Sequence, residues 1–263
     1  GKIVSVAPAF GVGGTRVTVT GERLLGGGSA IAEALLAGTK AEVVVPDGKS
    51  ASYKANFAKG TEVRLVAAVS SAVKSGPVQF TMDSGAVVHS KDVLFSYRAP
   101  GKITKVTPNS GQLDTQVVLE GTNLLAHGKN VVSVSLAGTP VKKLKTFADT
   151  VVEIIADDGK TATTGDIVLT AETGGVVSLE NGWTYGAKGT VKAVTPSVGQ
   201  RGTAVSIFGT NLRAHGKKIA SVTLAGIAAS ITEEKDLFVD VVAGAAAKAV
   251  VGNVVITADT GAT

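Results

Sequence analysis

A stretch of 31 residues occurs twice in this chain and constrains its fold more than any other feature. It runs from Pro108 to Gly138 and again, 88 residues later, from Pro196 to Gly226, with 18 identical residues and no gap. A more divergent copy runs from Pro8 to Gly38, 100 residues before the first. Repetition of this kind indicates one structural unit used several times. The sequence therefore predicts three tandem domains.

The repeats place the domain limits at residues 1–100, 101–188 and 189–263. Each segment is long enough to bury a hydrophobic core of its own. The links between them, residues 98–101 and 186–189, are very short. Short links limit swivelling of one domain against the next. We therefore expect three domains arranged as a rod.

Within each repeat, apolar residues recur at a period of two, which is typical of strands with one buried face. A Gly-Thr-Asn turn follows the second such run, and the leucine after it would fold back to fill the end of the core. In the second repeat we expect one core to contain Val117, Leu119, Leu124, Val134 and Leu136. About seven short strands per repeat, separated by turn signals, predict an all-β chain of immunoglobulin-like β-sandwiches.

The motifs of the repeat resemble those of a known family. Each repeat opens with V-x-P-x-x-G, and the second and third repeats continue with G-T-N-L and then S-V-x-L-A-G. An aromatic pair closes the first two repeats, Phe95 with Tyr97 and Trp183 with Tyr185. Over essentially its whole length the chain resembles the IPT/TIG family, immunoglobulin-like domains of plexins, transcription factors and cell-surface proteins. The resemblance implies the fold but no activity, because the family has no shared catalytic residues.

Composition excludes several classes of protein. The chain has no cysteine, which rules out a disulfide framework and thiol chemistry. No apolar run approaches the ~18 residues of a membrane-spanning helix, so we expect no membrane span. The net charge of +5 is spread along the chain, whereas nucleic-acid-binding domains usually concentrate basic residues on one face. We therefore expect no nucleic-acid partner.

One polar loop occurs in two of the repeats and is the clearest candidate binding site. It reads Ala-His-Gly-Lys and carries His127 and Lys129 in the second repeat, and His215 and Lys217 in the third. Such a loop could bind an anionic sugar or a metal, or it could be a surface turn with solvated side chains. The second interpretation is favoured, because a metal site needs three or four converging ligands. The first repeat replaces the loop with Gly26-Gly27-Gly28.

No constellation of residues indicates catalysis. No serine lies in a Gly-x-Ser-x-Gly elbow. The sequence Asp157-Asp158-Gly159 lacks the alternating acidic residues of a calcium loop, and His89 lies in a turn rich in serine and lysine. We expect no enzymatic activity, no cofactor and no bound metal.

The first repeat is longer than the second between Gly38 and Gly85. The extra segment contains Pro46-Asp47-Gly48-Lys49-Ser50, a turn signal. We expect this insertion to decorate one edge of the first sandwich.

The third repeat has no counterpart of the last strand of the second, which lies between Val177 and Lys188. A sandwich without this strand leaves neighbouring backbone groups unpaired, so Val254 and Ile256 on the neighbouring strand are candidate interaction residues. Either the chain is an excerpt of a longer array, or another molecule donates a strand. A head-to-tail contact between copies would build a homopolymeric filament.

These features favour a non-enzymatic, structural or adhesive array, extracellular or at the cell surface. The alternative is a carbohydrate-binding or accessory region of a larger secreted protein. A Rel-like DNA-binding protein is a third interpretation, against which the weak and dispersed charge weighs. The sequence has no Asn-x-Ser/Thr acceptor, whereas serine and threonine are plentiful, so any glycans would be O-linked.

Overall fold

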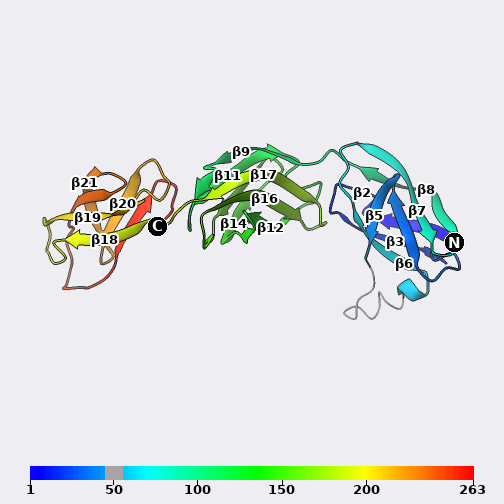
Figure 1. Cartoon of the computed structure of the whole chain (residues 1–263), viewed down its shortest axis with the longest axis horizontal. Helices are drawn as coiled ribbons and strands as arrows, with labels where there is room; N and C mark the ends of the chain where they lie inside the picture. Colours follow the sequence, from blue (N-terminus) through cyan, green and yellow to red (C-terminus); the bar gives the residue numbers. More distant parts are fainter. Residues whose placement is uncertain (45–55) are drawn as a thin grey trace.

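The structure is a computed structural model that describes residues 1–44 and 56–263. Figure 1 shows the three repeats one after another along the long axis, from the blue N-terminal repeat through the green one to the yellow and red third repeat. Among the described residues nearly every regular element is a β-strand, and no helix is long and apolar enough to cross a bilayer. The turn predicted at Pro46–Ser50 lies outside the described residues.

The first repeat folds into a single sheet that bends around its core. Its described strands are β1 (Lys2–Ala7), β2 (Phe10–Gly11), β3 (Arg16–Glu22), β4 (Ile31–Leu36), β5 (Thr39–Val43), β6 (Glu62–Ala67), β7 (Lys74–Met82) and β8 (Val87–Tyr97). Their order is β1-β3-β6-β5-β4-β7-β8-β2. Because β5 pairs with β6 on one side and β4 on the other, it joins the two layers of the sandwich. β2 runs parallel to β8.

The second repeat is a sandwich of two separate sheets. Its strands are β9 (Lys102–Thr107), β10 (Ser110–Gly111), β11 (Gln116–Thr122), β12 (Val131–Leu136), β13 (Thr139–Pro140), β14 (Lys143–Phe147), β15 (Val151–Ile155), β16 (Thr163–Ala171) and β17 (Val176–Tyr185). One sheet has the order β10-β17-β16-β12-β13 and the other β14-β15-β11-β9. β10 pairs parallel with the end of β17.

The third repeat has fewer strands than the other two. They are β18 (Thr190–Thr195), β19 (Ala204–Thr210), β20 (Ile219–Leu224), β21 (Ile227–Glu234), β22 (Phe238–Val242) and β23 (Val254–Ala258), in the order β18-β19-β22-β21-β20-β23. No strand in the described part of this repeat corresponds to β17 or to β10. β18 and β23 are the two edge strands.

The core of the second repeat follows from the two-residue period of its strands. Along β11 and β15, buried residues alternate with partly exposed ones. The five residues predicted to share a core, among them Leu124, all belong to one buried cluster. Leu124 is only 1% exposed, as expected if the Gly-Thr-Asn turn folds it back over the end of the sandwich. The predicted all-β fold of immunoglobulin-like sandwiches is confirmed.

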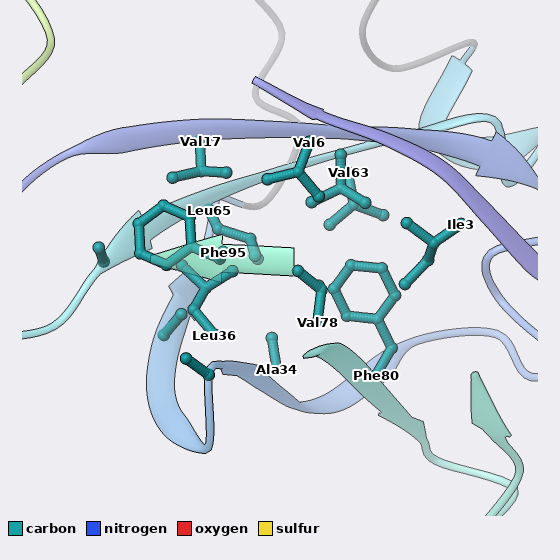
Figure 2. Packing of buried hydrophobic residues seen from close by; sticks show 14 of the residues in the cluster. Ile3, Val6, Val17, Ala34, Leu36, Val63, Leu65, Val78, Phe80 and Phe95 are labelled. Carbon is teal, nitrogen blue, oxygen red and sulfur yellow. The ribbon is translucent and has the colours of Figure 1, made fainter. Parts of the chain in front are cut away.

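The first repeat packs its core in the same way. Figure 2 shows residues of both layers pointing toward one another, with Val17, Val63 and Leu65 facing Leu36, Val78 and Phe80. Phe95, near the end of β8, lies within this cluster. The last strand thus contributes large aromatic side chains to the core of its repeat.

We expect Leu124→Ala to lower the free energy of unfolding by about 2–5 kcal/mol, because it removes buried methyl groups and leaves a cavity. The matched control is Val132→Ala, whose side chain is 60% exposed on β12 and which should change stability by less than about 0.5 kcal/mol. Urea unfolding followed by circular dichroism measures both. Equal effects of the two substitutions would contradict the core assignment.

The closing aromatic pairs have a consequence for the dependence of stability on pH. Trp183 and Tyr185 contact edge to face with ring centroids 5.6 Å apart, and Phe95 and Tyr97 repeat the contact at 5.2 Å. Burial raises the pKa of Tyr185 to about 12, and the negative charge of Asp157 adds to the rise. A buried tyrosinate is disfavoured because the charge loses its hydration.

We expect the second repeat to lose stability as the pH rises from about 10, where an unfolded tyrosine ionises, to about 12, where Tyr185 ionises in the fold. In that interval only the unfolded state releases this proton, so unfolding becomes more favourable. Tyr185→Phe should remove this component. The measurement is the difference in unfolding free energy between the two proteins at pH 9 and pH 11.5, and a difference that does not change with pH would overturn the expectation.

Candidate functional site

The structure brings the two histidine loops to the joints between repeats. The Nε2 atom of His127 lies 2.8 Å from the carbonyl oxygen of Ala99, in the link before the second repeat. The Nε2 atom of His215 lies 2.8 Å from the carbonyl oxygen of Ala187, in the next link. A carbonyl oxygen only accepts hydrogen bonds, so Nε2 carries the hydrogen and donates it in both joints. Each ring therefore ties a link to the repeat that follows it.

The backbone of the loop aims the ring at the link. Ala126 and His127 have φ angles of 48° and 63°, and Ala214 and His215 have 46° and 65°. Two successive left-handed residues are rare outside glycine and reverse the chain tightly. In the second joint the ring lies directly against Gly186, where an added Cβ would come within 2.1 Å of it.

The two lysines of the loops form hydrogen bonds with acidic side chains through their backbone N–H groups. The carboxylate of Glu172 accepts hydrogen bonds from the N–H groups of Lys129 and Asn130, both at 2.6 Å. Asp259 accepts one from the N–H of Lys217 at 3.0 Å. The hydrogen bonds to Glu172, that of Lys129 above all, hold the pKa of its carboxyl below the usual value. The lysine side chains are exposed.

A second contact in each joint joins main chain to main chain. The N–H of Arg16, the first residue of β3, donates to the carbonyl oxygen of Thr173 at 2.8 Å. In the next joint the N–H of Gln116, the first residue of β11, donates to the carbonyl oxygen of Thr260 at 2.8 Å. In both cases the acceptor belongs to the next repeat and lies in the turn after β16 or after β23. The two joints thus use equivalent atoms.

Glycine residues allow the turn of one repeat to lie this close to the strand edge of the repeat before it. Gly14 and Gly174 both have a φ of 85°, and a Cβ added to either would lie 2.6 Å from the carbonyl oxygen of the other. In the second joint, Gly261 (φ 87°) takes the place of Gly174, and its added Cβ would lie 2.9 Å from the side chain of Gln116. A side chain at the tip of the turn would separate the repeats.

Each joint also buries a side chain of the preceding repeat. Val12 is only 2% exposed and belongs to the buried cluster of the second repeat, not of its own. The equivalent residue in the next joint is Gln112, also buried. Its Nε2 atom donates to the carbonyl oxygen of Thr263 and its Oε1 atom accepts from the N–H of Gly189, both at 3.0 Å. The counterpart in the third repeat, Gln200, is exposed.

Each joint is formed by the turn of one repeat and by the strand edge of the repeat before it, which we call the receiving edge. Among the described residues, one such turn and one such edge have no partner. The turn of the first repeat has Gly85 (φ 80°) where the others have Gly174 and Gly261, and an added Cβ there would meet nothing within 4 Å. The receiving edge of the third repeat has Gly202 (φ 87°), which is equally open. The first repeat therefore exposes a turn, and the third repeat exposes an edge.

The other residues singled out in the sequence have different surroundings. Ile256 lies in the core of the third repeat and Val254 packs against it, partly exposed. Asp158 accepts a hydrogen bond from Lys188 Nζ at 2.7 Å. The expectation that His89 lies in a turn was wrong, because His89 is exposed within strand β8. Within residues 1–44 and 56–263 no group of three or more histidine or acidic residues could hold a metal ion.

The role of His127 and His215 at the joints is not evident from their spacing. One signal points to a shared role: the same Ala-His-Gly-Lys loop occurs at the same place in the second and third repeats and is replaced by glycines in the first.

No family model and no curated protein matches the chain. Among solved structures, two of the plexin A4 extracellular region are similar, with 18% identity over 94% of this chain and 21% of that chain (TM-score 0.46), and 13% over 98% and 32% (TM-score 0.40). The chain thus spans a fifth to a third of their length. A surface glycan-binding protein of Bacteroides ovatus, in complex with a mixed-linkage heptasaccharide, is 11% identical over 75% of this chain and 46% of that chain (TM-score 0.28).

We expect Gly174→Ala to loosen the first joint, because the new Cβ would collide with the carbonyl oxygen of Gly14. Amide exchange of Arg16, whose N–H crosses the joint, should become at least about tenfold faster. The matched control is Gly85→Ala, which imposes the same left-handed strain in the first repeat, where nothing contacts the turn. Equal exchange of Arg16 in both variants would show that the contact does not hold the joint.

Proposed function

We propose that the chain is a non-enzymatic structural module of the IPT/TIG type, whose repeats stack into a stiff rod that acts at the cell surface or outside the cell. The observation that carries the proposal is the joint, which uses equivalent main-chain atoms, equivalent turns and equivalent histidines at both junctions. Adjacent domains in a chain ordinarily move against one another unless their interface restrains them.

The three contacts of a joint restrain different motions. The histidine holds the link, the strand edge and turn fix the distance between the sandwiches, and the buried Val12 or Gln112 fills the space between them. Contacts at separate points resist both bending and twisting. A spacer or adhesive element needs this property, because it must keep a defined length.

The unused halves of the joint support a finer proposal, that copies of the chain stack head to tail. The turn of the first repeat reads Asp83-Ser84-Gly85-Ala86, close to Glu172-Thr173-Gly174-Gly175 in the first joint. The receiving edge of the third repeat begins at Ala204, the counterpart of Arg16 and Gln116. Such a contact joins different surfaces and does not close on itself, so repetition would give a filament.

Sedimentation velocity over a range of concentrations tests this assembly. We expect concentration-dependent association that Ala204→Pro weakens at least about tenfold, because proline removes the donor N–H of the receiving edge. Ala204→Val keeps that N–H and serves as the control. A monomer at every concentration, together with saturable binding of a soluble glycan by calorimetry, would instead favour the carbohydrate-binding alternative.

A further inference from the structure

The outer face of β19 and β22 in the third repeat carries two phenylalanines that lie opposite each other. Phe208 of β19 pairs with Phe238, the first residue of β22. The residues next to them along the strands, Ile207 and Val239, are fully buried in the core. Because side chains alternate between the two faces of a sheet, both phenylalanines point away from the core. Phe208 is 46% exposed, and Phe238 is partly exposed.

The same place on the other two repeats is polar. Phe208 lies opposite Ala193 of β18. The counterparts of these two residues form a hydrogen bond at 2.7 Å in the first repeat and an ion pair at 2.7 Å in the second: Ser5 with Thr20, and Lys105 with Glu120. Both polar pairs are exposed. This face is therefore open to solvent in all three repeats, including the two that have their last strand, and only the third makes it aromatic.

The neighbours of Phe208 leave much of its ring uncovered. Ala193 on one side has only a methyl group. On the other side, beyond Phe238, the Nζ atom of Lys235 lies 5.1 Å from the centroid of the Phe238 ring, a cation–π contact. Glu233 holds the same Nζ atom in an ion pair at 3.0 Å. Lys235 thus covers part of Phe238, and Phe208 remains the open ring.

A row of polar side chains crosses the same face beside the phenylalanines. Thr195, Ser206 and Asp240 lie opposite one another, two residues along their strands from the aromatic row and thus about 7 Å from it. Within residues 1–44 and 56–263 their side chains take part in no hydrogen bond or ion pair. Two hydroxyl groups and a carboxylate are therefore free to bind a ligand that lies on Phe208.

An open aromatic ring beside free hydroxyl and carboxylate groups matches the chemistry of a sugar. A sugar ring has a face of C–H groups, which packs on the negative face of an aromatic ring, and hydroxyl groups at its edge, which donate and accept hydrogen bonds. A wholly apolar partner would leave Ser206 and Asp240 without hydrogen bonds. The two carboxylates of Asp240 and Glu233 outnumber the single charge of Lys235, so an anionic sugar would be repelled.

We propose that the outer face of β19 and β22 binds a neutral polysaccharide chain. One sugar ring packs on Phe208, and its hydroxyl groups bind Ser206 and Asp240. An open sheet face buries little of a single sugar, so a chain of several sugars is the ligand that it suits. This binding goes beyond the stiffness and the stacking proposed above. It requires neither of them, because the receiving edge begins at Ala204, at the other end of β19.

Electrophoresis of the intact chain in native gels that contain a soluble polysaccharide tests the proposal. The neutral probes are mixed-linkage β-glucan, galactomannan and hydroxyethylcellulose, and the anionic probe is polygalacturonate. We expect at least one neutral probe to retard the chain in a concentration-dependent way, which gives a dissociation constant, and polygalacturonate to have no effect.

Three variants locate the site. Phe208→Leu should weaken binding at least about tenfold, because leucine has no aromatic face and aromatic anchors dominate such contacts, whereas Phe208→Trp should retain it. The matched control is Phe147→Leu, which removes a phenylalanine that is 40% exposed on β14 and should leave binding unchanged. Thermal unfolding followed by circular dichroism checks that each variant is folded.

Three outcomes would overturn the proposal: no retardation by any neutral probe, equal binding of the leucine and tryptophan variants at Phe208, or an equal loss in Phe147→Leu. Sedimentation velocity of the same variants keeps this test apart from that of stacking. Weaker self-association of Phe208→Leu, without any polysaccharide binding of the original chain, would assign the face to a protein contact instead.

Discussion

The arrangement of the repeats depends on the backbone N–H group of the first residue of β3 and of β11. In the first and second repeats this donor, on Arg16 or Gln116, points beyond its own sheet and finds its acceptor in the turn of the next repeat. The first and second repeats each contact the repeat that follows in this way, and Val12 extends the contact to the core, because it is buried in the sandwich of its neighbour.

Local periodicity explains why much of the fold could be predicted from the sequence. The alternation of Val117 with Leu119 and of Val134 with Leu136 indicated the buried faces of β11 and β12. β14 gives no such signal, because its residues, Lys143–Phe147, are mostly exposed and carry no apolar alternation. Sequence reasoning finds strands by their buried face, so a strand without one gives no signal.

The joints could not be predicted in the same way, because they form between atoms far apart in the sequence. His127 donates to a carbonyl group 28 residues earlier. Every residue has a backbone carbonyl group, so the sequence does not show which one is the acceptor. The loop was judged unsuited to metal binding on ligand number, and its carbonyl partner could not be named. Only the recurrence of the loop at the same place in the second and third repeats pointed to a shared role.

The dependence of the joint on main-chain atoms has a consequence for how such a chain can change over time. A junction built from matched side chains can pair only with its own partner, so duplicating or reordering its domains would break it. Here one contact of the joint uses an N–H group, a carbonyl group and a glycine turn, and it forms at Arg16 of a divergent repeat as it does at Gln116 of a closer one. The main-chain part of the joint can therefore form between copies that differ in sequence, whereas an exchange of copies would still have to preserve the histidine loop and the side chain buried at Val12 or Gln112.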